Sequence, residues 1–182
     1  MPKVDIYSTR NKYEIIYADP PWRYRDKRGN DPKAGGITYQ TMTLEEIKAM
    51  PIRDLAEKDC ALFMWVTMPM LREGLEVIDA WGFKYVTCAF TWIKQNPRND
   101  GIYSGLGMWT NGNAELCLLA RRGKPKRDAR NVKQVVVSHR ERHSKKPDEV
   151  RTRIVKLMGD KSRIELFARE YAEGWDCWGN EV

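Results

Sequence analysis

Apolar residues recur along this chain in two patterns, one typical of strands and the other of helices. Continuous or alternating runs of apolar and β-branched residues predict short strands. These runs cover residues 13–18, 61–67, 83–94, 115–120, 134–138 and 162–168. The run at 61–67 is apolar throughout, which is typical of a central strand in a parallel sheet, buried on both of its faces.

Helices are predicted between several of the strands, where apolar residues recur every three or four positions. The first follows Thr43 and Glu46, whose spacing is that of a capping box. Glycines end the other two, and acidic residues follow the proline that opens the last one. The predicted helices cover about 44–50, Leu71 to Gly82, and Pro147 to Gly159.

Strands that alternate with helices predict an α/β fold, with a mostly parallel sheet and helices on both of its faces. The chain has 182 residues, of which 42% are hydrophobic and 31% charged, so we expect a single domain over 1–182. We find neither a membrane-spanning apolar stretch nor an N-terminal signal region, and we expect a cytoplasmic protein. The four cysteines are far apart, so we expect reduced thiols and no metal site.

Three segments interrupt this pattern. A polar loop is expected over about 23–36, and a Gly- and Asn-rich loop over about 96–113. The third segment, 121–146, holds eleven Lys or Arg against Asp128 and Glu141, a net charge of +9. The whole chain carries +7, so its remainder sums to about −2. A basic segment of this length favours contact with nucleic acid, and the alternative is a solvated run of charge.

The clearest candidate for chemistry is the tetrapeptide Asp19-Pro20-Pro21-Trp22, directly after the strand at 13–18. Open α/β sheets bind their ligands at the carboxyl ends of strands. We expect the prolines to fix the backbone and to leave carbonyl oxygens without a competing amide donor. Asp19 and the Pro20 carbonyl can then accept both N–H hydrogens of an amine on a planar ring, which an aromatic side chain holds. The alternative is an ordinary Pro-Pro turn with a capping Asp.

Further motifs occur in a fixed order over nearly the whole chain. They lie at 39–42, 62–67, 81–83, 92–96, 143–149, 164–169 and 174–180. Together with Asp19–Trp22, they make the chain resemble the MT-A70 family of S-adenosylmethionine-dependent N6-adenine methyltransferases. The resemblance implies a Rossmann-like methyltransferase fold with a seven-stranded sheet in permuted order, the catalytic strand first and the cofactor strand last. The chain looks more like the short bacterial and phage members, which are expected to modify DNA.

The resemblance implies S-adenosylmethionine as the cofactor and the N6 amine of adenine as the acceptor. That amine is a poor nucleophile, because its lone pair is delocalised into the ring. Hydrogen bonds to Asp19 and to the Pro20 carbonyl would favour a tetrahedral nitrogen and return the lone pair to it. Direct displacement then needs positioning and charge complementarity, with no metal and no covalent enzyme intermediate. In duplex DNA the adenine must first be flipped out of the stack.

The resemblance also implies a set of cofactor contacts. Lys146 precedes a helix N-terminus, where its ammonium and the backbone amides suit the methionine carboxylate. Arg169 follows a segment that replaces the glycine-rich turn of other methyltransferases, and it is expected at the ribose. The expected cofactor-binding residues are Asp5, Ile6, Asp19, Lys146, Phe167, Arg169 and Asn180.

The expected substrate contacts are aromatic or basic residues and one amide. Trp22 is the first candidate for stacking on the target base and Tyr39 is the second, and the alternative for each is a place in the core. Lys94 and Asn96 end a strand near the expected substrate side. The expected substrate-binding residues are Tyr39, Lys94, Asn96, Arg121, Arg122 and Arg127.

The leading hypothesis is an enzyme that methylates N6 of adenine in DNA. An RNA substrate stays open, as does a catalytically silent, nucleic-acid-binding subunit of the same fold, although the intact Asp19 argues against a silent copy. A metal-dependent nuclease is disfavoured, because no second carboxylate lies at ligand spacing from Asp19. We expect DNA or RNA as the partner and no membrane, and a homo- or heterodimer stays open.

Overall fold

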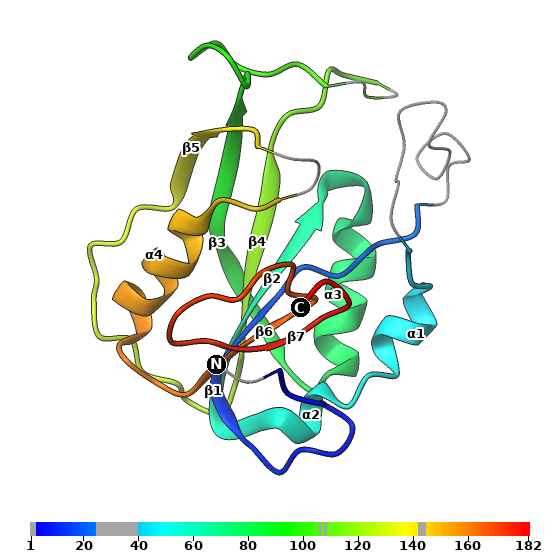
Figure 1. Cartoon of the computed structure of the whole chain (residues 1–182), viewed down its shortest axis with the longest axis vertical. Helices are drawn as coiled ribbons and strands as arrows, with labels where there is room; N and C mark the ends of the chain where they lie inside the picture. The colour runs from blue at the N-terminus through cyan, green and yellow to red at the C-terminus, as the bar shows by residue number, and fades with distance from the viewer. Residues whose placement is uncertain (1–2, 25–39, 106, 108, 142–144) are drawn as a thin grey trace.

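The computed structural model describes residues 3–24, 40–105, 107, 109–141 and 145–182. Within these ranges, seven strands form one sheet in the order β5-β3-β4-β2-β1-β6-β7 (Figure 1). The strands are β1 (Tyr13–Ala18), β2 (Ala56–Thr67), β3 (Lys84–Gln95), β4 (Glu115–Arg122), β5 (Val135–His139), β6 (Arg163–Leu166) and β7 (Asp176–Trp178). Every neighbouring pair is parallel except the two that contain β4. The predicted mostly parallel α/β sheet is therefore confirmed, although β2 is parallel to β1 and antiparallel to β4.

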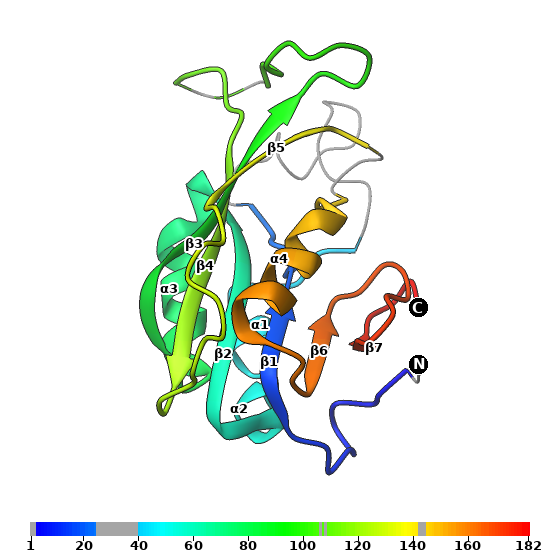
Figure 2. The ribbon, with the colours of Figure 1, turned by 90° about the vertical axis from the view of Figure 1, so that its left-hand side faces the viewer.

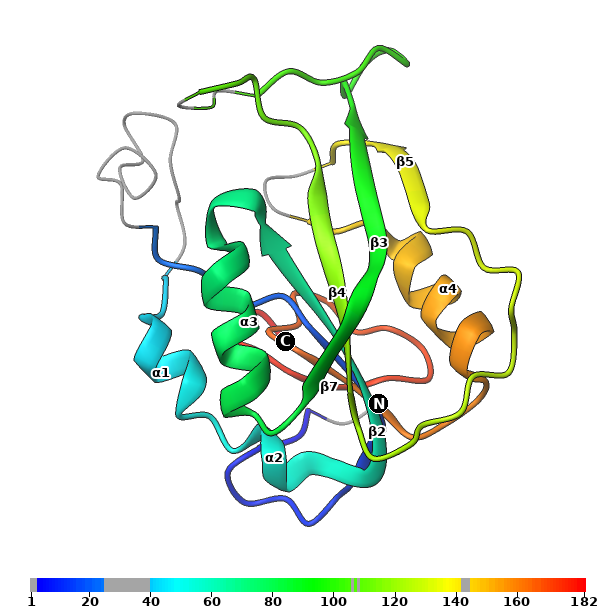
Figure 3. The same ribbon diagram turned by 180° about the vertical axis from the view of Figure 1, so that it is seen from behind.

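Helices cover both faces of the sheet, as predicted (Figures 2 and 3). On one face, α1 (Leu44–Lys48), α2 (Ile52–Leu55) and α3 (Leu71–Ala80) bury apolar side chains against β1, β2 and β4. On the other face, α4 (Asp148–Met158) buries Val150, Ile154 and Met158 against β1 and β2. Alternate residues of β1 and β2 belong to the two cores, which is why these strands read as continuously apolar. Among the described helices, none is long and apolar enough to cross a membrane.

Local signals account for several element ends. Thr43 caps α1, its hydroxyl accepting from the Glu46 N–H while the Glu46 carboxylate accepts from the Thr43 N–H, so the predicted capping box is confirmed. The strand predicted over 162–168 stops at Leu166, because Phe167 takes a positive φ of 61° that no strand accommodates. The segment that follows β6 therefore turns sharply beside the end of β1, where Leu166 pairs with Ala18.

Three features of the fold escaped the sequence patterns. β2 begins at Ala56 rather than at residue 61, because Ala56 pairs with Tyr13 of β1 and the polar residues after it lie in an irregularity of the register before Ala61 pairs with Ile15. The short α2 and β7 have too few residues to show a period. The loop expected over 96–113 lies between β3 and β4 in the residues described there, and most of the polar loop at 23–36 lies outside the described residues.

The direction of β4 divides the basic segment in two. Glu115, at the start of β4, pairs with Thr67 at the end of β2, so both lie at the carboxyl edge of β1 and β2. Arg121 pairs with Ala61, near the opposite edge. The connection at 123–133 then runs outside the sheet beside α4, where the Asp128 N–H donates to the Leu157 carbonyl (Figure 1). The first half of the basic segment is therefore remote from the carboxyl edge, and only its second half returns there through β5.

Candidate active site

Two hollows meet at the carboxyl end of β1. The aromatic hollow, about 370 Å³ including space open to solvent, is lined by Asp19, Pro20, Trp22, Tyr24, Trp65, Val66, Thr67, Glu115 and Lys146. The charged hollow, about 340 Å³ on the same measure, is lined by Tyr17, Asp19, Lys145, Lys146, Arg151, Glu165, Phe167, Arg169 and Glu170. Asp19 and Lys146 line both hollows. The first acidic residue after β1 therefore lies where two ligands could be brought together, as the position of a carboxylate after a strand predicts.

Asp19 belongs to a chain of alternating charges. The Lys146 ammonium lies 2.7 Å from one Asp19 carboxylate oxygen and 3.3 Å from the Glu115 carboxylate, and the Lys94 ammonium lies 2.5 Å from the other oxygen of Glu115. The four side chains are only 12–22% exposed. Asp19 is thus ion-paired, yet its carboxylate still borders both hollows. The pairing fixes its orientation, because Lys146 is anchored between two carboxylates.

The two carboxylates of this chain have opposite pKa shifts. Burial raises the pKa of Asp19 above its ordinary value of 3.8, and Lys146 offsets only part of that effect. Burial would also raise the pKa of Glu115, but Lys146 and Lys94 outweigh it and hold that pKa below its usual value. Sequence reasoning missed Glu115, because no spacing links it to Asp19; only the antiparallel placement of β4 brings it there.

The two prolines correct one expectation. Both of their carbonyls accept a backbone N–H, that of Trp22 on Pro20 and that of Met42 on Pro21, each at 2.9 Å. The expectation that no amide competes for these oxygens is therefore wrong. Proline lacks its own N–H, but the Trp22 N–H folds back in a three-residue turn. A carbonyl oxygen has two lone pairs, so Pro20, which lines the aromatic hollow, still has acceptor capacity for a second donor.

The aromatic walls of the first hollow are held by hydrogen bonds at their polar atoms. Trp22 is 5% exposed and belongs to the core, yet it also lines the hollow, and its indole N–H donates to the Trp65 carbonyl at 3.2 Å. The Trp65 indole N–H donates to the Tyr17 hydroxyl at 2.6 Å, and the Tyr24 hydroxyl donates to the Thr67 hydroxyl at 3.0 Å. Trp22 thus lies in the core and also borders the hollow, while its stacking on a base stays a prediction; Tyr24 and Trp65 were not anticipated. Tyr39 lies outside the described residues.

The charged hollow contains an ion pair that sequence reasoning did not identify. Arg151 of α4 contacts Glu165 of β6 through two nitrogens, at 2.7 and 3.3 Å, and Glu165 is 8% exposed. Burial raises the pKa of Glu165, an effect that Arg151 only partly offsets. Phe167, with its positive φ, lines the same hollow, and so does Arg169, whose guanidinium lies 3.4 Å from Glu181. The two expected cofactor residues after β6 therefore lie at this hollow.

The other expected cofactor residues gather around β7. The Val4 N–H donates to the Cys177 carbonyl, so the N-terminal segment follows β7, and Phe167 and Tyr7 each contact the Trp178 ring edge-to-face. In that segment Ile6 is 3% exposed and Asp5 is exposed. Asp5 accepts from the Ser8 hydroxyl and the Tyr7 N–H, and these bonds lower its pKa. Asn180 follows β7 and is exposed.

The expected substrate residues fall into three locations. Lys94 lies in the site through its contact with Glu115. Asn96 closes a turn, its side-chain amide donating to Asn99 and its backbone carbonyl contacting His139. Arg122 donates to the carbonyls of Arg53 and Ala56, at the edge opposite Asp19. Arg121 and Arg127 are exposed at or beyond that edge. The structure does not bring these three arginines together with Asp19.

Comparison with known proteins places this sequence in a family. The MT-A70 family model matches residues 13–181. The type II methyltransferase M.MunI of a Mycoplasma species is 36% identical, over 95% of this chain and 79% of that protein. The N(6)-adenosine-methyltransferase MT-A70-like protein of Arabidopsis thaliana is 30% identical over 99% of this chain and 25% of its own length. The human catalytic subunit METTL3 is 30% identical over 96% and 29%. The chain belongs to the MT-A70 family of S-adenosylmethionine-dependent N6-adenine methyltransferases.

Proposed function

We propose that this chain methylates N6 of adenine in DNA, and that the Asp19 carboxylate accepts a hydrogen bond from the adenine amine. The observation that carries the proposal is the place of Asp19 in the wall shared by the two hollows. Family membership supplies the reaction, and the choice of DNA is supported by the similarity to a type II methyltransferase, 79% of whose length is covered. The Arabidopsis and human adenosine methyltransferases are matched over only 25% and 29% of their length.

In this proposal the aromatic hollow holds the target adenine. Trp22, Tyr24 and Trp65 offer it flat apolar surface. The Asp19 carboxylate and the Pro20 carbonyl accept the two amine hydrogens, which directs the nitrogen lone pair away from the ring. Asp19 is the stronger hydrogen-bond acceptor when it is ionised, and the positive charge of Lys146 favours that form. No strong base is required, because the methylated nitrogen loses its proton readily.

The charged hollow is the expected place of the cofactor. Its charged side chains fit the methionine portion of the cofactor. Lys146 and Arg169 suit the carboxylate of that portion, and Glu165 and Glu170 suit its positive charge. The aromatic contacts of Phe167 and Trp178 adjoin it and fit a purine. Bound S-adenosylmethionine supplies an electrophilic methyl group on sulfur. The chain's own residues position the amine against that methyl group, which is the larger part of such catalysis.

The permuted order of the sheet is part of this proposal. β1, the first strand, ends in Asp19, and β6, near the end of the chain, leads into Phe167 and Arg169. β1 and β6 are parallel neighbours, so their carboxyl ends deliver the acceptor residue and the expected cofactor residues to one place. We infer that the catalytic strand comes first in this chain and that the cofactor-binding strands come last.

The test is incubation of the purified chain with labelled S-adenosylmethionine and matched DNA and RNA, followed by nucleoside analysis. We expect label in N6-methyldeoxyadenosine. Asp19→Asn, which keeps the shape but removes the charged acceptor, should lower the rate by about 100-fold or more. Asp79→Asn, at an exposed position of α3, is the matched control and should leave the rate unchanged. Label in RNA alone would replace DNA by RNA, and cofactor binding without any transfer would indicate a silent subunit.

A further inference from the structure

We propose that Arg140, stacked on Tyr103, binds a phosphate group of the DNA strand next to the target adenosine. The inference rests on the proposed function and adds a substrate contact that lies outside both hollows. The guanidinium carbon of Arg140 lies 3.9 Å from the centre of the Tyr103 ring. An arginine held flat on an aromatic ring keeps its N–H groups in the plane of the guanidinium, where they can form paired bonds to phosphate oxygens.

The stacked pair is fixed by backbone contacts from both sides. The Arg140 N–H donates to the Gln95 carbonyl at 3.1 Å, and the Tyr103 N–H donates to the Lys94 carbonyl at 2.9 Å. The Asn113 side-chain amide donates to the carbonyls of both Lys94 and Tyr103. Two segments far apart in the sequence are thus attached to the end of β3. A guanidinium fixed in this way loses little conformational entropy when it binds an anion.

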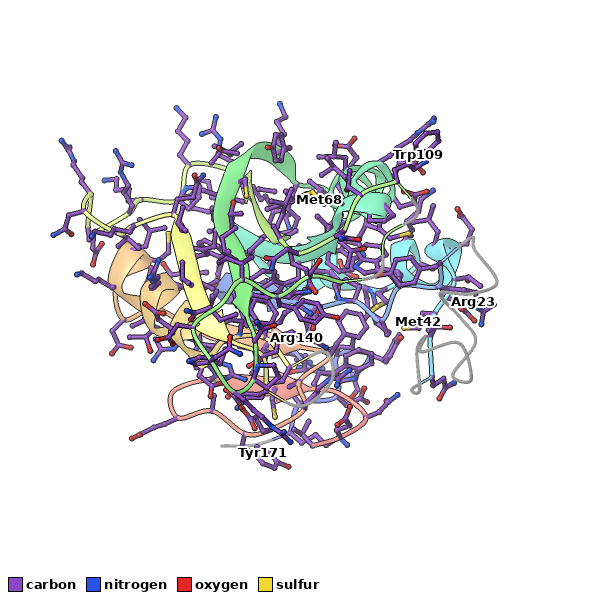
Figure 4. All side chains as sticks on the ribbon, turned by 90° about the horizontal axis from the view of Figure 1, so that it is seen from above. Arg23, Met42, Met68, Trp109, Arg140 and Tyr171 are labelled. Carbon is purple, nitrogen blue, oxygen red and sulfur yellow. The ribbon has the colours of Figure 1, made fainter. Side chains whose placement is uncertain are left out.

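The stacked pair lies beside the chain of alternating charges that contains Asp19. Lys94 links the two, because its carbonyl accepts from Tyr103 while its ammonium contacts Glu115 in the wall of the aromatic hollow. Figure 4 looks down on the top of the molecule as drawn in Figure 1, and it shows Arg140 near the middle of this upper face. A nucleotide whose base enters the aromatic hollow must leave its phosphates outside, on this same face. Phosphate is therefore the anion that the geometry brings to Arg140.

Arg140 is also available for an anion. Among the residues that the structure describes, no carboxylate lies within 4.0 Å of its guanidinium, whereas Lys94, Lys145, Lys146 and Arg151 all have carboxylate partners. Arg140 is partly buried rather than fully solvated. A partly desolvated cation that lacks an anionic partner in the described structure binds phosphate more strongly than a fully exposed one.

The experiment combines substitutions with a DNA oligonucleotide that the unaltered protein methylates. Single phosphates on either side of the target adenosine are replaced, one at a time, by neutral methylphosphonates. In the unaltered protein, one of these replacements should lower kcat/KM by about 5- to 100-fold, the usual effect of removing a charged interaction. Arg140→Ala should lower kcat/KM for the natural oligonucleotide to a similar extent. It should then show no further decrease at that one linkage.

The controls separate this role from a structural one. Arg98→Ala, at an exposed position of the loop that contains Tyr103, should keep the full sensitivity to every methylphosphonate. Arg140→Lys should retain part of that sensitivity, because it keeps the charge and loses the stack. Tyr103→Leu should reduce the decrease in kcat/KM that the one methylphosphonate causes, without abolishing methylation. Equal decreases in the unaltered protein and in Arg140→Ala at every linkage would overturn the inference. Failure of the unaltered protein to methylate any DNA would instead reject the proposed function.

Discussion

Asp19 is subject to two opposing influences. Burial makes its ionised form costly, and Lys146 at 2.7 Å stabilises that form. The outcome is a raised pKa, so the carboxylate is protonated at a higher pH than an exposed aspartate would be. The proposed mechanism relies on the ionised form, because a protonated carboxyl is a weaker acceptor for the amine and adds an O–H donor of its own. The charge of Lys146 is therefore part of the acceptor's function.

We expect methyl transfer to fall on the acid side with an apparent pKa above 3.8, the ordinary value for aspartate. The rate should be high above the folded-state pKa of Asp19 and decline as the pH falls through it. Lys146→Met removes the compensating charge and should move this acid limb to higher pH. The measurement is kcat/KM for DNA against pH at saturating cofactor.

Lys145→Met provides the control for this pH profile. Lys145 also lines the charged hollow, but its ammonium pairs with Glu141 and Asp148 rather than with Asp19. This variant should leave the acid limb in place. An acid limb at or below pH 3.8, or one that Lys146→Met does not move, would remove Asp19 from the role given to it.

At the scale of elements, α3 lies unusually close to β2. A Cβ atom on Gly74 of α3 would lie 2.4 Å from a methyl carbon of Val66. Real Cβ atoms do not approach so closely, so the glycine is required by packing rather than by backbone conformation. Val66 also lines the aromatic hollow, so this contact connects the packing of the helix to the shape of the site.

Gly74→Ala is expected to lower the free energy of unfolding by about 1–3 kcal/mol, because it overpacks the contact with Val66. For a chain of this size that corresponds to roughly 2–4 °C of Tm per kcal/mol. Thermal unfolding measures it. Adding Val66→Ala should recover part of the stability by making room. Gly112→Ala is the matched control, since nothing lies within 4 Å of its added Cβ. A Gly74→Ala protein as stable as the parent would mean that α3 can move away from β2 at little cost.

The elements show which parts of the fold follow from local signals. The capping box at Thr43 and the buried runs of β1 and β2 involve neighbours in sequence, so they were predictable. So was Asp19, because a carboxylate after a buried strand has a fixed place in this class of fold. Glu115 was not predictable, since it reaches Asp19 only through the antiparallel direction of β4. The pairing of Arg151 with Glu165 also escaped, because it depends on where α4 lies relative to β6 in three dimensions.

At the scale of the whole molecule, positive charge is distributed over two regions. Six exposed cations lie in the first half of the basic segment: Arg121, Lys124, Lys126, Arg127, Arg130 and Lys133. At about 3.3 Å per strand residue, Arg121 lies roughly 20 Å along β4 from Glu115. The second half returns to the active site with Arg140, Lys145 and Lys146. Charge counted along the sequence cannot distinguish these two regions, because it contains no information on the direction of β4.

The remote region should affect DNA binding but not catalysis. We expect Arg121→Glu combined with Arg127→Glu to weaken DNA binding and to reduce the salt slope by about 0.9 for each phosphate that the protein no longer neutralises. The value of kcat at saturating DNA should be unchanged, because neither side chain reaches Asp19. Binding titrations over a range of salt, together with steady-state kinetics, measure both quantities. Arg72→Glu, an exposed position of α3, is the control. An unchanged slope would exclude this region from DNA binding.

The wall that the two hollows share has a thermodynamic consequence. Asp19 and Lys146 belong to both hollows, so a ligand that reorients this pair in one hollow changes what the other hollow presents. Linkage then requires reciprocity, with each ligand altering the affinity of the other by the same factor. A dissociation constant for either ligand consequently has meaning only together with the concentration of its companion.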